Sequence, residues 1–219
     1  MLKSYLPAKF NTFFIIFFII FWLFSSYKVL TFLSLVYIIL YLILRKSRND
    51  FRDDPVTTRG VIFSPANGRI INIENNVSHG MFGEQLVEIQ IMIPWWREMG
   101  IVLPLSAEIK NLLLLKGQSF FRYKKGAEVL GSKEGKGVGL ELYTRGESIG
   151  LTLLKCKLGL WPDLLVMPGD RGVRRVNIGY FPFGGTVMLY LPKKYEILVK
   201  INDEVNAGET IFAVSPDNI

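Results

Sequence analysis

Cysteine and histidine are almost absent from this sequence of 219 residues, since each occurs once, as Cys156 and His79. A single cysteine excludes an internal disulfide and leaves no set of thiolates to hold a metal ion. The alternating pattern of residues 153–158 favours a packing role for Cys156 over a reactive thiol. His79 lies in the loop Ser78–Gly80, where a lone histidine is most often a solvated side chain and not a catalytic one.

Signatures of nucleic-acid binding are also missing. The sequence has no zinc-finger spacing, no aromatic RNA-binding motif and no basic stripe, so we expect no nucleic-acid partner and no bound metal. The chain is nevertheless basic, with 26 lysines and arginines against 19 acidic residues and a net charge of +7. This moderate excess suits an anionic lipid surface. The most basic loop, Arg122–Gly126, is interpreted either as a solvated face or as a contact with anionic headgroups.

Acidic residues are missing from the first 44 positions, which hold three lysines and two long apolar runs, Phe13–Phe24 and Val29–Leu44. Each run is shorter than the ~20 residues that an upright membrane helix needs. We therefore predict an α-helical hairpin over residues 1–46 that anchors the chain in the membrane, followed by a polar linker over residues 47–60. The alternatives are a signal peptide that ends near Ser25–Ser26 and one long tilted helix.

Basic residues flank both ends of the predicted hairpin, with Lys3 and Lys9 before it and Arg45, Lys46 and Arg48 behind it. Positively charged flanks stay on the cytoplasmic side of a membrane. The expected location is therefore the inner (cytoplasmic) membrane, with the remainder of the chain in the cytoplasm.

Residues 61–219 carry the patterns of β-strands. The turn Ser64–Gly68 separates two short strands, and its Asn67-Gly68 pair is typical of a tight hairpin. Thr186–Leu191 follows two adjacent glycines and is typical of a buried strand. We predict a mainly β domain over this part of the chain.

Glu84–Pro94 alternates as a strand, with Val87, Ile89, Ile91 and Ile93 on one side and Glu88, Gln90 and Met92 on the other. The tryptophans that follow, Trp95 and Trp96, fit either a core or an anchor near lipid headgroups, and we favour the core.

Four motifs occur in the order in which a known family has them. They are Phe51-Arg-Asp-Asp-Pro55, Ser64-Pro-Ala-Asn-Gly68, Gly179-Tyr-Phe-Pro-Phe-Gly-Gly-Thr186 and Ala207-Gly-Glu-Thr210. Through them the sequence resembles the phosphatidylserine decarboxylases of the short bacterial type. The resemblance implies a barrel-sandwich-like β domain behind the membrane hairpin, and a place in phospholipid (phosphatidylethanolamine) metabolism.

The residues that do the chemistry in that family are replaced here. In the family, a serine that follows a glycine cleaves the chain and becomes the pyruvoyl group, which forms a Schiff base with the substrate amine. Gly185 stands at the position of that serine, between Gly184 and Thr186, and has no β-carbon from which a pyruvoyl group could form. The helper aspartate corresponds to Asn67, and the segment of the helper histidine reads Trp95–Pro104, without a histidine.

These replacements predict a catalytically degenerate relative of a lyase, without a pyruvoyl cofactor, that acts by binding lipid headgroups or by regulation. The expected partner is a membrane lipid, with an aminophospholipid as the candidate. A homo-oligomer, or a hetero-oligomer with an active relative, is left open. A second hypothesis is an active decarboxylase that processes itself at an atypical site, either Gly131/Ser132 or Thr186. A third is a non-enzymatic, membrane-tethered β-barrel adaptor that binds proteins.

Overall fold

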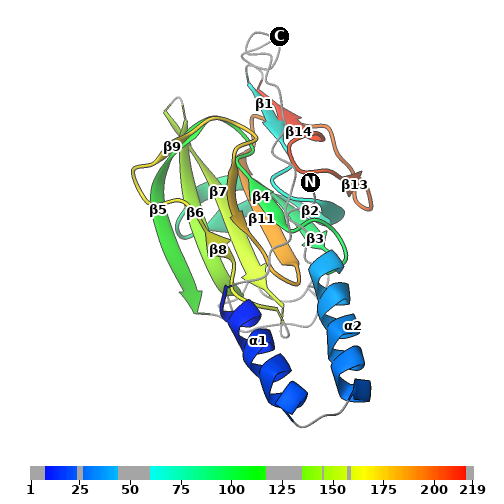
Figure 1. Cartoon of the computed structure of the whole chain (residues 1–219). Coiled ribbons are helices and arrows are strands. Elements are labelled where there is room, and N and C mark those ends of the chain that lie inside the picture. Colours follow the sequence, from blue (N-terminus) through cyan, green and yellow to red (C-terminus); the bar gives the residue numbers. More distant parts are fainter. Residues whose placement is uncertain are drawn as a thin grey trace. The chain divides into compact units, whose positions relative to one another are not determined.

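The computed structural model describes residues 8–23, 27–43, 60–116, 135–144, 146–156 and 159–215. Contacts divide the chain into two units, Met1–Lys46 and Ser47–Ile219. The first unit is helical and the second is built from strands (Figure 1). The mainly β class predicted from the sequence is confirmed.

Two helices form the first unit, α1 (Ala8–Leu23) and α2 (Tyr27–Ile43), of 16 and 17 residues. They pack against each other, with the rings of Phe14 and Tyr37 in edge-to-face contact at 5.3 Å between centroids. On α2 the Ser34 hydroxyl donates to the Leu30 carbonyl at 2.8 Å, which satisfies a polar group within an apolar helix. The helical pair expected from the two apolar runs is thus present.

A full crossing of a membrane by either helix is not supported. Within the described ranges, no helix has both the length and the apolar character that a bilayer crossing requires. Large apolar side chains are nevertheless exposed on both helices, among them Ile15, Trp22, Phe32 and Leu35.

The described part of the second unit contains fourteen strands. They are β1 (Val61–Phe63), β2 (Gly68–His79), β3 (Gly83–Ile93), β4 (Gly100–Val102), β5 (Ala107–Lys116), β6 (Lys136–Thr144), β7 (Glu147–Lys155), β8 (Asp163–Leu164), β9 (Arg171–Gly172), β10 (Asn177–Tyr180), β11 (Gly185–Pro192), β12 (Glu196–Ile197), β13 (Glu204–Val205) and β14 (Ile211–Val214). The large sheet has the order β13-β2-β3-β11-β7-β6-β5-β9, and two three-stranded sheets have the orders β1-β14-β12 and β4-β10-β8.

One apolar core joins the three sheets. It contains the inward-facing residues of β3, β11 and β7, for example Ile89, Leu189 and Leu151, all with no exposed surface. Ile101 of β4 and Phe212 of β14 belong to the same cluster. Alternation along the strands produces this face, because successive side chains of a strand point to opposite sides of the sheet.

The sheets are open, which differs from the barrel-like character that the resemblance implied. The large sheet ends at β13 on one side and β9 on the other, and no pairing among the described strands closes it. Because its edge strands have only two residues each, both edges are short. The predicted hairpin around Asn67-Gly68 is also wrong, since β1 pairs with β14 while β2 pairs with β3.

The face of β3 that carries Glu88 and Gln90 is buried as well. Glu88 and Gln90 are 5% and 6% exposed, and they lie beside an apolar cluster that includes Phe82, Met188 and Tyr190. The Gln90 amide donates to the Glu88 carboxylate. Burial raises the pKa of Glu88 above its ordinary value near 4.5, against the opposing effect of hydrogen bonds from Gln90 and Tyr190.

Replacing Glu88 by glutamine is expected to raise the free energy of unfolding at neutral pH, because the amide keeps the shape of the carboxylate without burying a charge. The folded-state pKa of Glu88 is raised, so the stability of the native chain falls as pH rises from the ordinary pKa to the folded-state value. This decline should flatten in Glu88→Gln. Thermal unfolding followed across about pH 4 to pH 8 measures both effects, with each kcal/mol moving the Tm by about 2–4 °C.

Glu209→Gln is the matched control for this measurement, because Glu209 is exposed and no buried charge is removed. Its pH profile should coincide with that of the native chain. A Glu88→Gln chain that is less stable at neutral pH than the native chain would contradict the interpretation.

Candidate functional site

The positions that correspond to the family's catalytic residues gather around the end of β3. This strand lies between β2 and β11 in the large sheet. The register aligns Arg69 of β2 with Met92 of β3, and Met92 with Thr186 of β11. The turn that contains Asn67 and the turn that contains Gly184 therefore flank the same strand end. The four positions Asn67, Gly184, Gly185 and Thr186 therefore lie near the same end of β3.

The turn before β11 is tight and conformationally restricted. The Gly184 N–H donates to the Phe181 carbonyl at 3.0 Å, and both Phe183 and Gly184 have positive φ, 62° and 71°. A Cβ at Gly184 would lie 2.2 Å from the Ile93 carbonyl oxygen. Gly184 is thus required both by its backbone conformation and by the close approach of β3.

Gly185 is enclosed for a different reason. A Cβ at this position would lie 2.4 Å from Cζ of Phe181 and 2.5 Å from the carbonyl oxygen of Leu154. Phe181 has no exposed surface, and Leu154 is next to Lys155, the β7 partner of Gly185 in the sheet. The volume that a serine side chain needs is filled by a buried ring and a backbone carbonyl.

Gly185→Ser is expected to destabilise the fold by about 1–3 kcal/mol, the usual cost of overpacking a well-filled interior. The ring of Phe181 could shift, but the Leu154 carbonyl belongs to the backbone of a paired strand. Urea unfolding measures the loss.

Gly80→Ser serves as the control for this change, because a Cβ at Gly80 meets no atom within 4 Å. It should unfold like the native chain. Equal stability of the two variants would show that the residues around Gly185 rearrange at little cost, and would contradict the expected loss.

Asn67 uses its side-chain amide to join two segments of backbone. Its Oδ1 accepts from the Ala207 N–H at 2.9 Å, and its Nδ2 donates to the Glu98 carbonyl at 3.4 Å. A carboxylate could accept the first bond but has no donor for the second. The amide is therefore suited to a bridging role between the loop after β3 and the turn after β13.

Asn67→Asp is expected to destabilise the chain at neutral pH by about 1–3 kcal/mol, because the new carboxylate faces the Glu98 carbonyl without a proton to donate. The carbonyl raises the pKa of the introduced carboxyl group. The loss should therefore grow as pH rises through that pKa and shrink at acidic pH. Unfolding at two pH values tests this.

Asn75→Asp provides the comparison, since Asn75 is an exposed residue of β2. Its stability should change little and without this pH dependence. An Asn67→Asp chain that matches it at every pH would exclude the bridging role.

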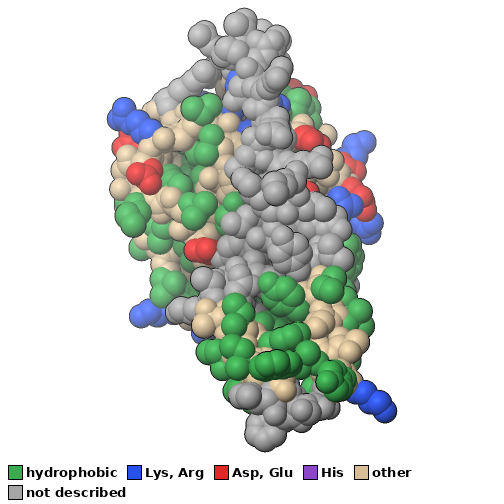
Figure 2. Space-filling model, in the orientation of Figure 1, with side chains coloured by type: hydrophobic (Ala, Val, Ile, Leu, Met, Phe, Trp, Pro, Cys, Tyr) green, Lys and Arg blue, Asp and Glu red, His purple; other side chains and the backbone are tan. Residues whose placement is uncertain are grey.

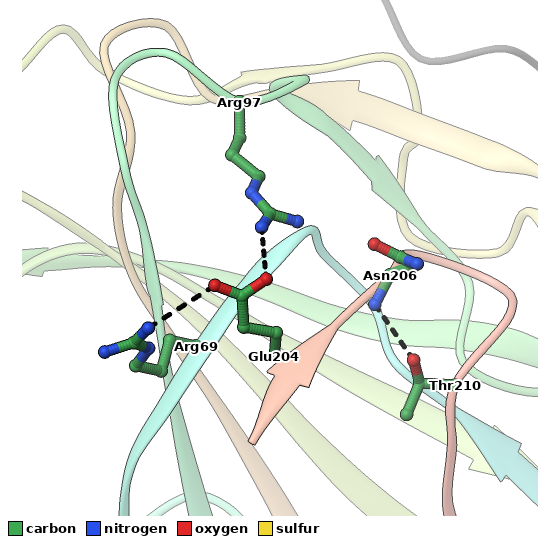
Figure 3. Close-up of polar contacts among 5 residues, drawn as sticks. All are labelled: Arg69, Arg97, Glu204, Asn206 and Thr210. Atoms are coloured by element: carbon green, nitrogen blue, oxygen red, sulfur yellow. Dashed lines mark hydrogen bonds and ion pairs between the residues drawn. The ribbon is translucent and has the colours of Figure 1, made fainter. Parts of the chain in front are cut away.

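A surface ion-pair network holds the same two segments together (Figure 3). The carboxylate of Glu204 bonds to Arg97 at 2.6 Å and to Arg69 at 3.4 Å. Hydrogen bonding from Arg97, followed by the charges of both arginines, lowers the pKa of Glu204. The following turn closes on itself, because the Asn206 N–H donates to the Thr210 hydroxyl at 2.9 Å. The groups are exposed, so the network positions these segments more than it stabilises the fold.

The remaining residues singled out from the sequence lie elsewhere. His79 is at the other end of the β2–β3 pair, where it stacks on Phe82 at 4.3 Å between ring centroids and contacts Tyr190 at 4.8 Å. It is half-buried and not simply solvated, and it is outside the site. Cys156 is half-buried beside Gly159. The Gly131/Ser132 position and the loop Arg122–Gly126 lie outside the described residues.

Thr186 is the one hydroxyl among the family-equivalent positions. It is 5% exposed and is paired on both sides, with Met92 of β3 and Leu154 of β7. In the part of the chain that the structure describes, no three or more His, Cys, Asp or Glu residues lie together in a group that could hold a metal ion.

The core position expected for the two tryptophans after β3 is wrong. Trp95 and Trp96 are 52% and 61% exposed, with their rings in edge-to-face contact at 5.5 Å. They lie in the turn closed by the bond from the Arg97 N–H to the Pro94 carbonyl. The alternation of β3 ends at Pro94, and the tryptophans beyond it no longer follow the pleat of the sheet.

Several residues of the site were missed by sequence reasoning. Phe181, which fills the space beside Gly185, could have been suspected because a glycine often permits the close approach of a neighbouring ring. The pairing of Arg97 with Glu204 joins positions 107 residues apart and has no local signal.

The described second unit is an all-β domain with its candidate site where two turns meet the end of a central strand. The sequence model of the family described as phosphatidylserine decarboxylase matches residues 147–213, a range that includes Gly184 and Gly185. The chain is 23% identical over 180 residues to the phosphatidylserine decarboxylase proenzyme of Parabacteroides distasonis, covering 80% of this chain and 79% of that protein.

Two further relatives have the same description. The chain is 27% identical over 173 residues to the phosphatidylserine decarboxylase proenzyme of Geotalea uraniireducens, with 77% of each chain covered. It is 26% identical over 167 residues to that of Desulfotalea psychrophila, covering 73% of this chain and 72% of the relative. The family-model match and these relatives together support membership of the chain in the phosphatidylserine decarboxylase family.

The pyruvoyl group that the family resemblance implies does not fit this site. At the position of the family's serine, its precursor would have to be a side chain at residue 185, and a Cβ there would lie within 2.6 Å of Phe181 and Leu154 atoms. The site offers hydrogen-bonding groups and charged residues. The glycine at position 185, however, has no side chain from which a pyruvoyl group could be made.

Proposed function

We propose that the chain is a membrane-associated member of the phosphatidylserine decarboxylase family that forms no pyruvoyl group and acts by binding an aminophospholipid headgroup or by regulating an active relative. The observation that carries this proposal is the filled space at Gly185. The residue has no side chain, and the Phe181 ring and Leu154 carbonyl leave no room for one.

The helper positions support the same conclusion. Asn67 does not titrate. Its side-chain Oδ1 and Nδ2 both form hydrogen bonds to backbone groups. The chain's one histidine, His79, lies at the far end of the β2–β3 pair. General acid–base catalysis needs a titratable group within hydrogen-bond reach of the reacting atoms. Neither Asn67 nor His79 supplies such a group at the end of β3.

Membrane association is inferred from the first unit and the charge of the chain. The helices expose large apolar side chains such as Ile15 and Phe32, and basic residues flank them in the sequence. We propose residues 1–46 as a hairpin that dips into the inner membrane, 47–60 as a linker and 61–219 as a cytoplasmic lipid-binding domain. The bilayer provides the aminophospholipid that the names of the relatives suggest.

Intact-mass analysis of the purified chain should show one species of 25.0 kDa. Gly185 has no hydroxyl group that could attack the backbone and cleave the chain there. Incubation with phosphatidylserine in mixed micelles should release no carbon dioxide above a protein-free blank. Gly185→Ser alone should remain unprocessed, since Asn67 and the histidine-free loop are unchanged.

Other outcomes of this experiment would favour the competing hypotheses. Two fragments divided before Ser132 or Thr186, with a blocked N-terminus on the C-terminal piece, would establish an active decarboxylase with an atypical site. An unprocessed chain that binds no aminophospholipid vesicle would contradict the lipid-binding role and favour a protein-binding adaptor.

A further inference from the structure

Four exposed apolar side chains lie on the two sides of the turn that precedes β11. Trp95 and Trp96 are 52% and 61% exposed, and Leu160 and Trp161 are 37% and 38% exposed. We call these four residues the tryptophan rim. In a soluble domain, tryptophans normally bury much of their large apolar surface, so exposed ones gathered at one end of a domain indicate a contact surface.

The register of the large sheet brings the two halves of the rim to one end of the domain. Gly185 pairs with Ile93 on one side and with Lys155 on the other. Trp95 and Trp96 follow the end of β3, and Leu160 and Trp161 follow the end of β7. Both halves therefore flank the first residue of β11.

The three-stranded sheet β4-β10-β8 independently places the two halves of the rim at one end. Tyr180 of β10 pairs with Gly100 of β4 and with Asp163 of β8. Trp96 precedes Gly100, and Trp161 precedes Asp163. Since β4 and β8 both run antiparallel to β10, the two chain segments that carry the tryptophans enter this sheet from the same end.

Positive charge lies over one member of the rim, Trp161. The ammonium groups of Lys136 and Lys155 lie 5.5 Å and 5.7 Å from the centroid of the Trp161 ring. Such cation–π contacts hold the ammonium groups close to the ring. Glu98 and Asp163 are the acidic residues nearest in the sequence to the two halves of the rim.

We propose that the tryptophan rim docks on the interfacial layer of an anionic bilayer, with Lys136 and Lys155 contacting lipid phosphates. Tryptophan favours this layer because its indole has an apolar body and a polar N–H, and basic residues near an anionic surface are attracted to it. A protein partner is less well matched, because the two halves lie on separate loops and carry exposed indoles beside lysines, a combination suited to lipid headgroups. The inference rests on the proposed membrane association and adds a second contact, made by the β domain itself.

The test uses the full chain reconstituted into vesicles that contain phosphatidylglycerol and phosphatidylcholine brominated near the headgroup end of its acyl chains. A Trp161 reporter carries Trp22→Phe, Trp95→Phe and Trp96→Phe. A second reporter keeps Trp96 and replaces Trp22, Trp95 and Trp161. Both should lose fluorescence intensity to the brominated lipid and emit at shorter wavelength than in lipid-free detergent solution.

The matched control is Tyr143→Trp in a chain whose four native tryptophans are replaced by phenylalanine. Tyr143 is 41% exposed and lies at the opposite end of β6 from Lys136. This reporter should keep its intensity. Quenching of all three reporters to the same extent, or of none, would overturn the proposal.

The lysines are tested in the Trp161 reporter. Lys136→Glu combined with Lys155→Glu should abolish most of the quenching in anionic vesicles, whereas Lys193→Glu, next to the far end of β11, should not. Equal quenching in the two variants would contradict the role of the lysines.

Flotation of the vesicles separates this inference from the proposed function. A chain that does not float with vesicles contradicts membrane association altogether. A chain that floats while Trp161 and Trp96 stay unquenched contradicts only the tryptophan rim. Chain processing and carbon dioxide release are independent of both outcomes.

Discussion

The close packing around Gly185 is the constraint on which the candidate site depends. A backbone carbonyl of β7 and the buried ring of Phe181 occupy the space where any other residue would place its Cβ. The ring is brought there by the turn of Phe181–Gly184, which requires positive φ at Phe183 and Gly184. Because interiors are packed at the density of organic crystals, this space cannot be shared with a side chain.

The polar groups of the site serve the same arrangement. Asn67 bridges the backbone at Glu98 and Ala207, and Glu204 draws Arg97 toward the turn after β13. The positions that correspond to the family's chemistry are thus engaged in holding turns together. At the outer side of those turns lie exposed tryptophans and lysines, which is the composition of a surface that meets lipid headgroups. Figure 2 shows that basic residues and exposed apolar side chains are both present on the surface of the molecule.

The sequence predicted the main elements where a local pattern specifies them. The apolar runs became two helices, and the alternation of Glu84–Pro94 became β3. The burial of Glu88 was missed, because alternation identifies the apolar face of a strand but does not reveal what packs on the other face. The turn at Asn67-Gly68 was mistaken for a hairpin. Gly68 is needed there because a Cβ would lie 2.3 Å from the Met92 carbonyl oxygen, a requirement that comes from the neighbouring strand.

The amino-acid sequence alone determined the covalent possibilities, since glycine at position 185 has no β-carbon and no rearrangement of the fold can supply one. It also determined the apolar and basic character of the N-terminal unit, because composition does not depend on packing. Only the tertiary structure decided that a ring fills the space at Gly185, that Asn67 bonds to Ala207 and that Trp95 and Trp96 face solvent. Those contacts join segments distant in the chain, and their geometry follows from strand register and close packing, which no local pattern of residues encodes.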